Sequence, residues 1–342
     1  MIAPLSIPGG WMWSRWQPQR GMPFNSYFFQ TDGGGVAIDP LALEEEDMRH
    51  LRDLGGVTTI VVTNPDHVRE SAALADAFGA RIVDSAAEGS EVFPGAIALA
   101  LLHGKSPEIA LYLPEYDAAI VGDAVLGSPA GAFSLLPDEK LADPRRFAFG
   151  LRKLWGRNLR MLLPCDGYPV FANADALLGD LLYARLGAEV FRINLDDIPF
   201  VFSKEKIGRY SVSDGETGLL IGARKLGYRV ADIPPGHAFC PLHWHVEEEE
   251  FFYVIAGQPS VRMSGGTLQC RPGDFIAFPV GERGAHQLLN ESEATARVLL
   301  VGPNAPHESC FYPDSDKVLV EANGLVRRMV KAGPDLDYWD GE

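Results

Sequence analysis

The chain has 342 residues, more than one ordinary hydrophobic core accommodates, so we expect two domains. Its formal net charge of −16 opposes contact with the phosphate backbone of nucleic acids and with anionic membranes, so we expect neither as a partner. The apolar stretches are too short to cross a bilayer, and the N-terminus has no basic segment followed by an apolar one, so we expect a cytoplasmic protein without a signal peptide.

The first half of the chain alternates short apolar runs with segments of helical spacing. Apolar runs that predict buried strands lie at 36–40, 58–63, 81–84, 96–103, 109–114 and 118–123, and helical patterns lie at 41–55, 70–80, 144–154 and 172–186. Strands interleaved with helices are typical of a layered α/β domain.

The pattern of apolar residues changes from about residue 205 onward. Short apolar runs such as EEFFYVIAG and ARVLLVG follow one another, separated by Gly- and Pro-containing turns. This spacing predicts an all-β barrel or sandwich. The junction falls within 193–211, and we divide the chain into an N-terminal domain at 1–195 and a C-terminal domain at 196–342.

The C-terminal half contains a pattern of metal-binding side chains. His243 and His245 are two residues apart, so on a strand both would face the same side. Glu250 can return on the next strand, and His286 on a later one. Three imidazoles and one carboxylate suit a divalent transition metal, with positions left open for water or a ligand.

These residues lie in two motifs that resemble those of the cupin family. The first motif is matched by the HxH pair, by Glu250 and by Gly257, and the second by the series Gly273, Pro279, Gly281, His286 and Asn290, with two extra residues before the histidine. Glu249 is the alternative ligand if the gap is counted differently. The resemblance covers about residues 215–320 and implies a jelly-roll β-barrel that holds one Zn, Fe, Mn or Ni ion, and a homodimer.

The order of elements in 25–175 resembles the metallo-β-lactamase fold, an αββα sandwich. The segments that carry the resemblance are FNSYFF and VAIDP, then IVVTNPDHVRESAALADAFGARIV, then HGKSPEIALYLP and AAIVGDAVLG, and finally LLPCDGYPV. In that family these positions hold a first strand pair ending in Asp, a THxHxDH loop, a GHTPG loop, a GD turn and a final GHG.

The family's histidine loop is altered here and reads TNPDHVR at 63–69. Aligned from the following helix, Asp66 and His67 take the place of the family's DH pair. Aligned from the start of the loop, Asn64 and Asp66 replace the first two histidines and Arg69 replaces the last. We favour the first alignment because the helix then needs no gap.

The remaining ligand positions are altered as well. Lys105 stands where the GHTPG histidine would be, Asp123 keeps the bridging aspartate, and Asp166 replaces the last histidine. The usual two-zinc hydrolase site is therefore not expected. A residual site of Asp66, His67, Asp123 and Asp166 would have hard ligands that favour Mn, Mg or Fe over Zn, with the Lys105 ammonium partly neutralising Asp123. The alternative is a set of satisfied polar groups in a domain that has lost catalysis.

Three functions are compatible with these patterns. The cupin-like half could act through its metal on a small oxygen-rich metabolite, as an isomerase, lyase or dioxygenase. It could instead bind or sense such a molecule without catalysis, on a lactamase-like scaffold. A metal-dependent hydrolase at the residual N-terminal site is the third hypothesis. Both folds host many chemistries, so fold alone does not choose among them.

Overall fold

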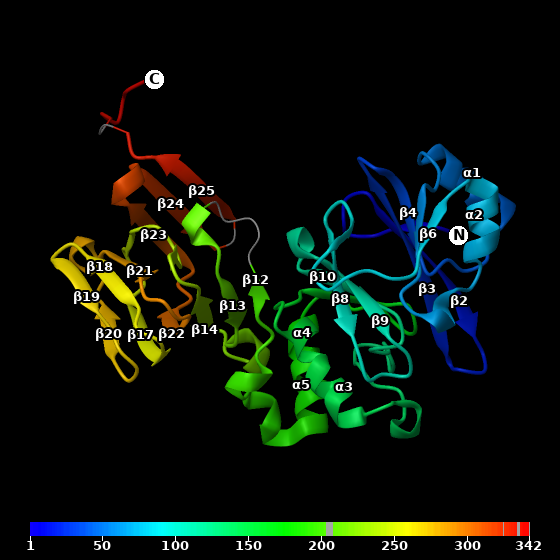
Figure 1. Cartoon of the computed structure of the whole chain (residues 1–342). Helices are drawn as coiled ribbons and strands as arrows, with labels where there is room; N and C mark the ends of the chain where they lie inside the picture. The colour runs from blue at the N-terminus through cyan, green and yellow to red at the C-terminus, as the bar shows by residue number, and fades with distance from the viewer. Residues whose placement is uncertain (203–207, 324, 334–335, 342) are drawn as a thin grey trace. The chain divides into compact units, whose positions relative to one another are not determined.

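The computed structural model describes residues 1–202, 208–323, 325–333 and 336–341. The chain divides into two compact units, Met1–Arg192 and Ile193–Glu342 (Figure 1). The α/β first half and the all-β second half expected from the sequence are confirmed. Each unit has its own apolar core, so each is described by itself.

The N-terminal unit contains two sheets. The first has the order β1-β2-β3-β4-β5-β6, antiparallel as far as β4 and parallel from β4 to β6; its strands are β1 (Ala3–Pro4), β2 (Gly10–Gln17), β3 (Met22–Thr31), β4 (Gly34–Ile38), β5 (Thr59–Val61) and β6 (Arg81–Val83). The second has the order β11-β10-β9-β8-β7 and consists of β7 (Glu91–Phe93), β8 (Ala96–Leu101), β9 (Glu108–Leu113), β10 (Ala118–Val121) and β11 (Met161–Pro164). Only β10 and β11 pair in parallel in this second sheet.

Five α-helices cover these sheets: α1 (Glu45–Asp53), α2 (Ser71–Phe78), α3 (Pro144–Gly150), α4 (Arg152–Trp155) and α5 (Ala174–Leu186). Leu51 of α1 and Leu74 of α2 share a core with the first sheet. Helices α3 to α5 share a core with the second sheet, and a third core lies between the two sheets. Strand β10 shows the layering directly, because Ile120 faces the other sheet while Val121 faces the helices. The unit is therefore an αββα sandwich.

The C-terminal unit is built from strands in three sheets. The first has the order β12-β13-β14-β22-β17-β20, the second β15-β21-β18-β19 and the third β16-β23-β24-β25. The strands are β12 (Val201–Phe202), β13 (Ser213–Glu216), β14 (Leu226–Ile233), β15 (His237–Ala238), β16 (Trp244–His245), β17 (Glu250–Ala256), β18 (Ser260–Met263), β19 (Gly266–Gln269), β20 (Phe275–Phe278), β21 (His286–Asn290), β22 (Ala296–Pro303), β23 (His307–Tyr312), β24 (Lys317–Ala322) and β25 (Val326–Lys331). Across the described residues they form a sandwich of separate sheets rather than one closed barrel.

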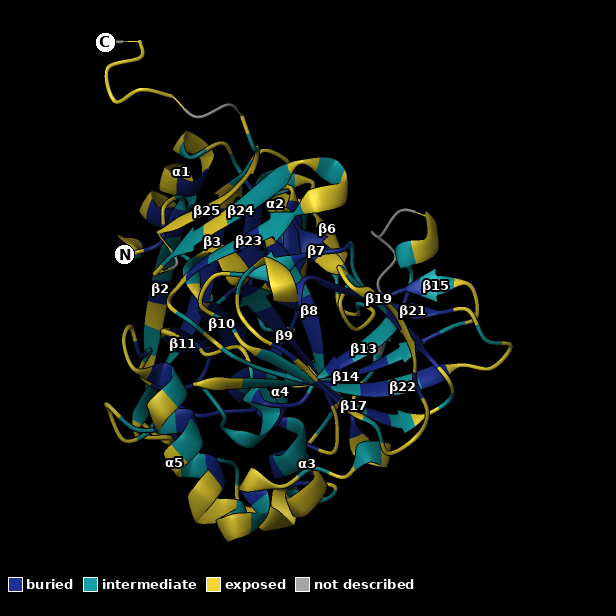
Figure 2. Ribbon diagram, turned by 90° about the vertical axis from the view of Figure 1, so that its left-hand side faces the viewer, coloured by how far each residue is buried: buried dark blue, intermediate teal, exposed yellow. Residues whose placement is uncertain are grey.

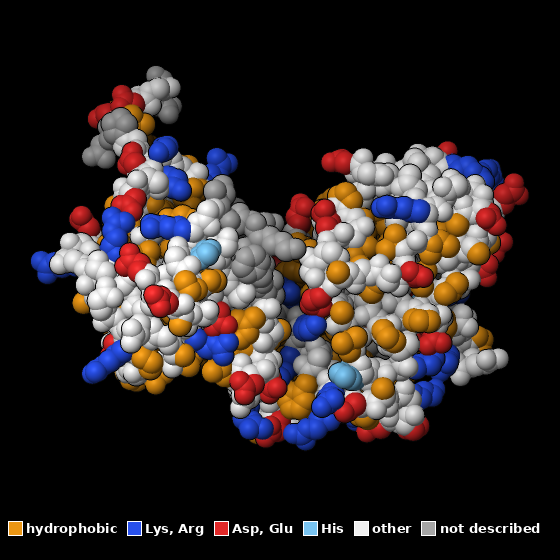
Figure 3. Space-filling model, viewed as in Figure 1, with side chains coloured by type: hydrophobic (Ala, Val, Ile, Leu, Met, Phe, Trp, Pro, Cys, Tyr) orange, Lys and Arg blue, Asp and Glu red, His pale blue; other side chains and the backbone are white. Residues whose placement is uncertain are grey.

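Alternation along these strands places the core between the first and second sheets. Phe252, Val254, Val298 and Leu300 from the first sheet pack against Leu288 from the second. Along β17 and β22 buried residues alternate with intermediate ones, and Figure 2 draws the buried ones in dark blue. On the face drawn in Figure 3, acidic and basic side chains are interspersed with apolar ones. Among the helices of the described residues, none combines the length and the apolar character needed to cross a membrane.

Candidate metal centre and a second polar cluster

The structure brings together all four side chains of the C-terminal pattern. His243 forms an isolated bridge to His286 at the start of β21, His245 lies on β16, and Glu250 begins β17. The Oε2 atom of Glu250 is 3.6 Å from Nε2 of His243, 3.4 Å from Nε2 of His245 and 2.9 Å from Nε2 of His286. Residues more than forty positions apart, His243 and His286, therefore meet at one carboxylate oxygen.

Two of the imidazoles are held by backbone carbonyls. Nδ1 of His243 donates to the carbonyl oxygen of Pro241, and Nδ1 of His286 to that of Gly284, each at 2.9 Å. A carbonyl only accepts, so Nδ1 carries a proton in both rings, and Nε2 is the nitrogen that points toward Glu250. Hydrogen bonds of this kind, from the ring nitrogen that does not face the metal, orient histidines for metal binding.

Several atoms of this group are buried without a hydrogen-bond partner. They are both ring nitrogens of His245, Oε2 of Glu250 and Nε2 of His286. Buried polar atoms are normally paired, because an unpaired one loses its hydration without compensation. Nε2 of His245 and Nε2 of His286 converge on Oε2 of Glu250, whereas Nδ1 of His245 faces Glu248 and Glu308. Imidazole nitrogens with a carboxylate oxygen are the donors that a divalent transition metal accepts. The residues present therefore fit the metal that the cupin resemblance implies.

The charges of the group are strongly coupled. Burial opposes the charge on Glu250, but the three imidazoles outweigh it and lower the pKa of this carboxyl far below its usual range. Burial also opposes a charge on His243, but Cys240 and Glu250 raise the pKa of its ring to about 12. Burial lowers the pKa of His286. A metal cation bound here would therefore compete with protons for the same nitrogen and oxygen atoms.

Strand β23 contributes residues that the sequence analysis missed. Glu308, Cys310 and Tyr312 alternate along it, so they share one face. The buried carboxylate of Glu308 accepts the backbone N–H groups of residues 246, 247 and 248 at 2.9, 3.2 and 2.8 Å. These residues form the loop between His245 and Glu250, so Glu308 fixes how the loop returns to the candidate metal centre. Neither motif includes this strand.

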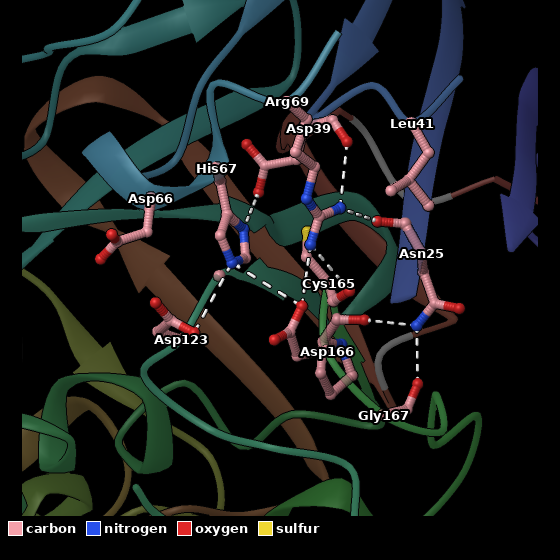
Figure 4. Close-up of polar contacts among 12 residues, drawn as sticks. Asn25, Asp39, Leu41, Asp66, His67, Arg69, Asp123, Cys165, Asp166 and Gly167 are labelled. Atoms are coloured by element: carbon pink, nitrogen blue, oxygen red, sulfur yellow. Dashed lines mark hydrogen bonds and ion pairs between the residues drawn. The ribbon is translucent and has the colours of Figure 1, made fainter. Parts of the chain in front are cut away.

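The N-terminal unit has a second cluster of titratable groups, at the ends of its strands (Figure 4). Asp39 follows β4, Asp123 follows β10, Asp166 lies just beyond β11, and His67 ends a short 3₁₀ turn, Pro65–His67. Nδ1 of His67 donates to Oδ2 of Asp39 at 2.7 Å. Its Nε2 is 3.6 Å from Asp123 and 3.7 Å from Asp166. Ligand atoms of these last three residues lie within 4.8 Å of one another.

A buried guanidinium group enters the same cluster. Arg69 donates from Nη2 to Oδ1 of Asp166 at 2.8 Å, and from Nη1 to the backbone oxygens of Asn25 and Asp39 at 2.7 and 3.1 Å. It also donates to the carbonyl oxygen of Cys165 (Figure 4). An organic cation is therefore part of this site. The sequence offered Arg69 only through the less favoured alignment.

Asp66 and Lys105 lie apart from the cluster. They form an ion pair of 2.8 Å in which both side chains are more than two-fifths exposed. Of the four residues expected for a residual site, the structure thus groups His67, Asp123 and Asp166 and leaves Asp66 outside (Figure 4). Lys105 and Asp123 line the same pocket of about 40 Å³. The direct partner of Lys105 is Asp66, because that carboxylate is the nearer one.

Burial and charge perturb the titrations here. Burial opposes protonation of His67, but Asp123 and Asp39 raise the pKa of its ring to about 10. Burial raises the pKa of Asp166 to about 6. It also raises the pKa of Glu108 to about 8, although this carboxylate accepts the backbone N–H groups that follow β10. Glu108 was not expected from the sequence, because it begins an otherwise apolar strand.

Comparison with known proteins assigns both halves of the chain. The family model described as the metallo-beta-lactamase superfamily matches residues 2–185, and the cupin domain model matches residues 229–302. A curated relative, the polyketide synthase CurC of Streptomyces cyaneus, is 29% identical over 101 residues, which is 29% of this chain and 64% of the relative. The chain thus spans less than two thirds of that relative's length.

Solved structures also match parts of the chain. A sugar phosphate isomerase from a cupin superfamily, from Silicibacter pomeroyi, is 26% identical, with 44% of this chain and 98% of that chain covered and a TM-score of 0.39. The polyketide cyclase RemF from Streptomyces resistomycificus is 24% identical, with 33% of this chain and 79% of that chain covered and a TM-score of 0.29.

Proposed function

The chain belongs to the metallo-β-lactamase superfamily and carries a cupin domain in its C-terminal part, and we propose that this cupin domain binds one divalent transition metal and acts on or senses a small oxygen-rich metabolite. The ligands are His243, His245, Glu250 and His286. The metal is Zn, Fe, Mn or Ni.

The observation that carries this proposal is the convergence of buried, unpaired ligand atoms on one point. A structural polar network would pair these atoms with one another or with the backbone. Instead the backbone bonds of His243 and His286 use Nδ1 and leave Nε2 free for a metal. The apolar wall beside them, in which Phe278 stacks on His286 with ring centroids 3.8 Å apart, keeps the ligand rings fixed.

A metal held there would supply Lewis acidity to an oxygen ligand such as a sugar derivative or a keto or hydroxy acid. The chain itself orients the ligands through backbone carbonyls, fixes the connecting loop through Glu308, and walls the centre with aromatic rings. These features serve catalysis and sensing equally, so the proposal includes both.

The test is the metal content of the full chain, purified without chelator and measured by elemental analysis. We expect about one transition metal per chain in the wild type, and loss of that metal in His245→Ala and Glu250→Ala. Glu249→Gln is the matched control, because Glu249 lies in the same loop and is exposed. Wild-type protein without metal would contradict the proposal. Loss of metal in the control would move the ligand role to Glu249.

A second candidate function is a metal-dependent hydrolase at the N-terminal cluster. It is favoured by the grouping of His67, Asp123 and Asp166 within 4.8 Å, beside a pocket. The buried Arg69 guanidinium opposes it, because a cation already binds Asp166. A second metal equivalent that survives Glu250→Ala and disappears in Asp123→Asn would support the hydrolase. Absence of any such equivalent would reject it.

A further inference from the structure

Strand β23 presents a thiol to the cupin ligands. It pairs with β16 in an antiparallel register that places Cys310 directly opposite His245 and Phe311 opposite Trp244. The rings of Trp244 and Phe311 stack with centroids 4.2 Å apart. Because neighbouring residues of a strand point to opposite faces, Cys310 and His245 both lie on the other face, which is the face of the metal centre.

The sulfur of Cys310 lies close to two of the ligands. Its Sγ and one ring nitrogen each of His243 and His245 lie within 4.8 Å of one another. Only 2% of Cys310 is exposed, so the thiol is shielded from solvent. Tyr312, two residues further along the same face, stacks on the ring of His243 with a centroid distance of 5.9 Å. The face of β23 is thus packed directly against the HxH pair.

A second observation also points to a ligand site in this region. His286 is 1% exposed, and its Nε2 has no hydrogen-bond partner although it faces the centre. Both ring nitrogens of His245, the residue opposite Cys310, are also unpaired. A second triad, His243 with Glu250 and His286, shares His243 with the cysteine group. The two groups are therefore joined through His243.

We propose that Cys310 is a sulfur ligand of the cupin metal, in addition to the three histidines and Glu250. The inference rests on the proposed metal site and adds a donor that neither cupin motif contains. On binding, the thiol releases its proton to solvent and the sulfur coordinates as a thiolate. A soft thiolate selects zinc, iron, cobalt or nickel over manganese and magnesium, so the cysteine narrows the choice of metal.

The first experiment uses the full chain loaded with Co²⁺ as a spectroscopic probe, with bound cobalt measured by elemental analysis in the same samples. The wild type should show a near-ultraviolet thiolate-to-cobalt charge-transfer band, and Cys310→Ala should lose the band. Cys270→Ala is the matched control, because Cys270 is also buried in this unit but packs in its apolar core. Its band should equal that of the wild type.

The outcomes separate the two proposals. Wild-type protein that binds no cobalt would overturn the metal site itself. Cobalt bound at His243, His245, Glu250 and His286 without a charge-transfer band would overturn the sulfur ligand alone.

A measurement on the wild type avoids dependence on a variant that fails to fold. X-ray absorption of the zinc-loaded chain should show a sulfur at about 2.3 Å beside nitrogen and oxygen at about 2.0–2.2 Å. Loss of a residue that only hydrogen-bonds a metal ligand weakens metal binding roughly 10–100-fold. Cys310 is proposed as a direct ligand, so Cys310→Ala should weaken zinc binding by at least that factor. A zinc shell of nitrogen and oxygen alone would overturn the inference.

Discussion

Replacing Glu308 by glutamine tests whether this buried carboxylate holds the metal loop. Its Oε1 accepts the backbone N–H of Val246 at 2.9 Å and of Ser309 at 2.6 Å, and its Oε2 accepts those of Glu247 and Glu248 at 3.2 and 2.8 Å. Glutamine has the same shape, but its amide nitrogen only donates. Whichever way the amide turns, two backbone N–H groups then face an NH₂ group.

The expected cost follows from these bonds. A hydrogen bond to a charged group contributes about 1.5–3 kcal/mol, so the loss of two gives an upper range of about 3–6 kcal/mol. Relaxation of the exposed loop reduces this, and we expect about 3 kcal/mol, which is a factor of roughly 150 in an opening equilibrium. Since the loop links His245 to Glu250, metal affinity should also fall roughly 10–100-fold.

The assay is hydrogen exchange followed by mass spectrometry on the full chain. Peptides that contain residues 246–248 should exchange about 100-fold faster in Glu308→Gln than in the wild type. Peptides from the N-terminal unit should be unchanged. The control Glu249→Gln alters an exposed side chain of the same loop and should behave as the wild type. Wild-type exchange and wild-type metal affinity in Glu308→Gln would refute the role of these four hydrogen bonds.

Three further predictions concern charge and metal. The first compares two variants by urea titration of the free energy of unfolding. Arg69→Met leaves buried carboxylates without their cation and should lower this free energy by about 3–5 kcal/mol. Lys105→Met breaks an exposed ion pair and should lower it by about 1 kcal/mol or less. The folded-state pKa of His67 is raised from 6.5 to about 10, so its stabilisation is complete below pH 6.5 and is lost as the pH rises through 10. Melting curves across that window should show a loss of at most about 5 kcal/mol that His67→Gln lacks. Chelator should lower the melting temperature of the wild type but not of Glu250→Ala, because only the former has metal to lose; equal shifts in both would contradict this.

The four side chains of the proposed metal site could be grouped from the sequence because their spacing is local. His243 and His245 share a strand face whatever the rest of the fold does, and Glu250 follows within one short loop. His286 came from a second motif of fixed spacing, and the structure pairs it directly with His243. The αββα layering was predictable for a similar reason, since buried strands and amphipathic helices differ in the period of their apolar residues.

The residues on β23 could not be predicted from such patterns. Glu308, Cys310 and Tyr312 matter because β23 pairs with β16, more than sixty residues earlier in the chain. Cross-strand pairing at that separation leaves no local periodicity in the sequence. In the N-terminal unit the direction in which a side chain points decides whether it joins the polar cluster. His67 points inward and the adjacent Asp66 points to Lys105, although the sequence grouped both at one site.

The two polar clusters differ in how their buried charges and polar atoms are compensated. In the N-terminal unit the carboxylates of Asp39, Asp123 and Asp166 are faced by two cations of the chain itself, the Arg69 guanidinium and the protonated ring of His67. Every strong charge there has a partner within the fold. In the cupin domain both ring nitrogens of His245, Nε2 of His286 and Oε2 of Glu250 are buried without a hydrogen-bond partner. An added cation would relieve that deficit in the cupin domain, but in the N-terminal unit it would compete with Arg69. The proposed metal site is therefore placed in the domain whose ligand atoms the chain does not satisfy by itself.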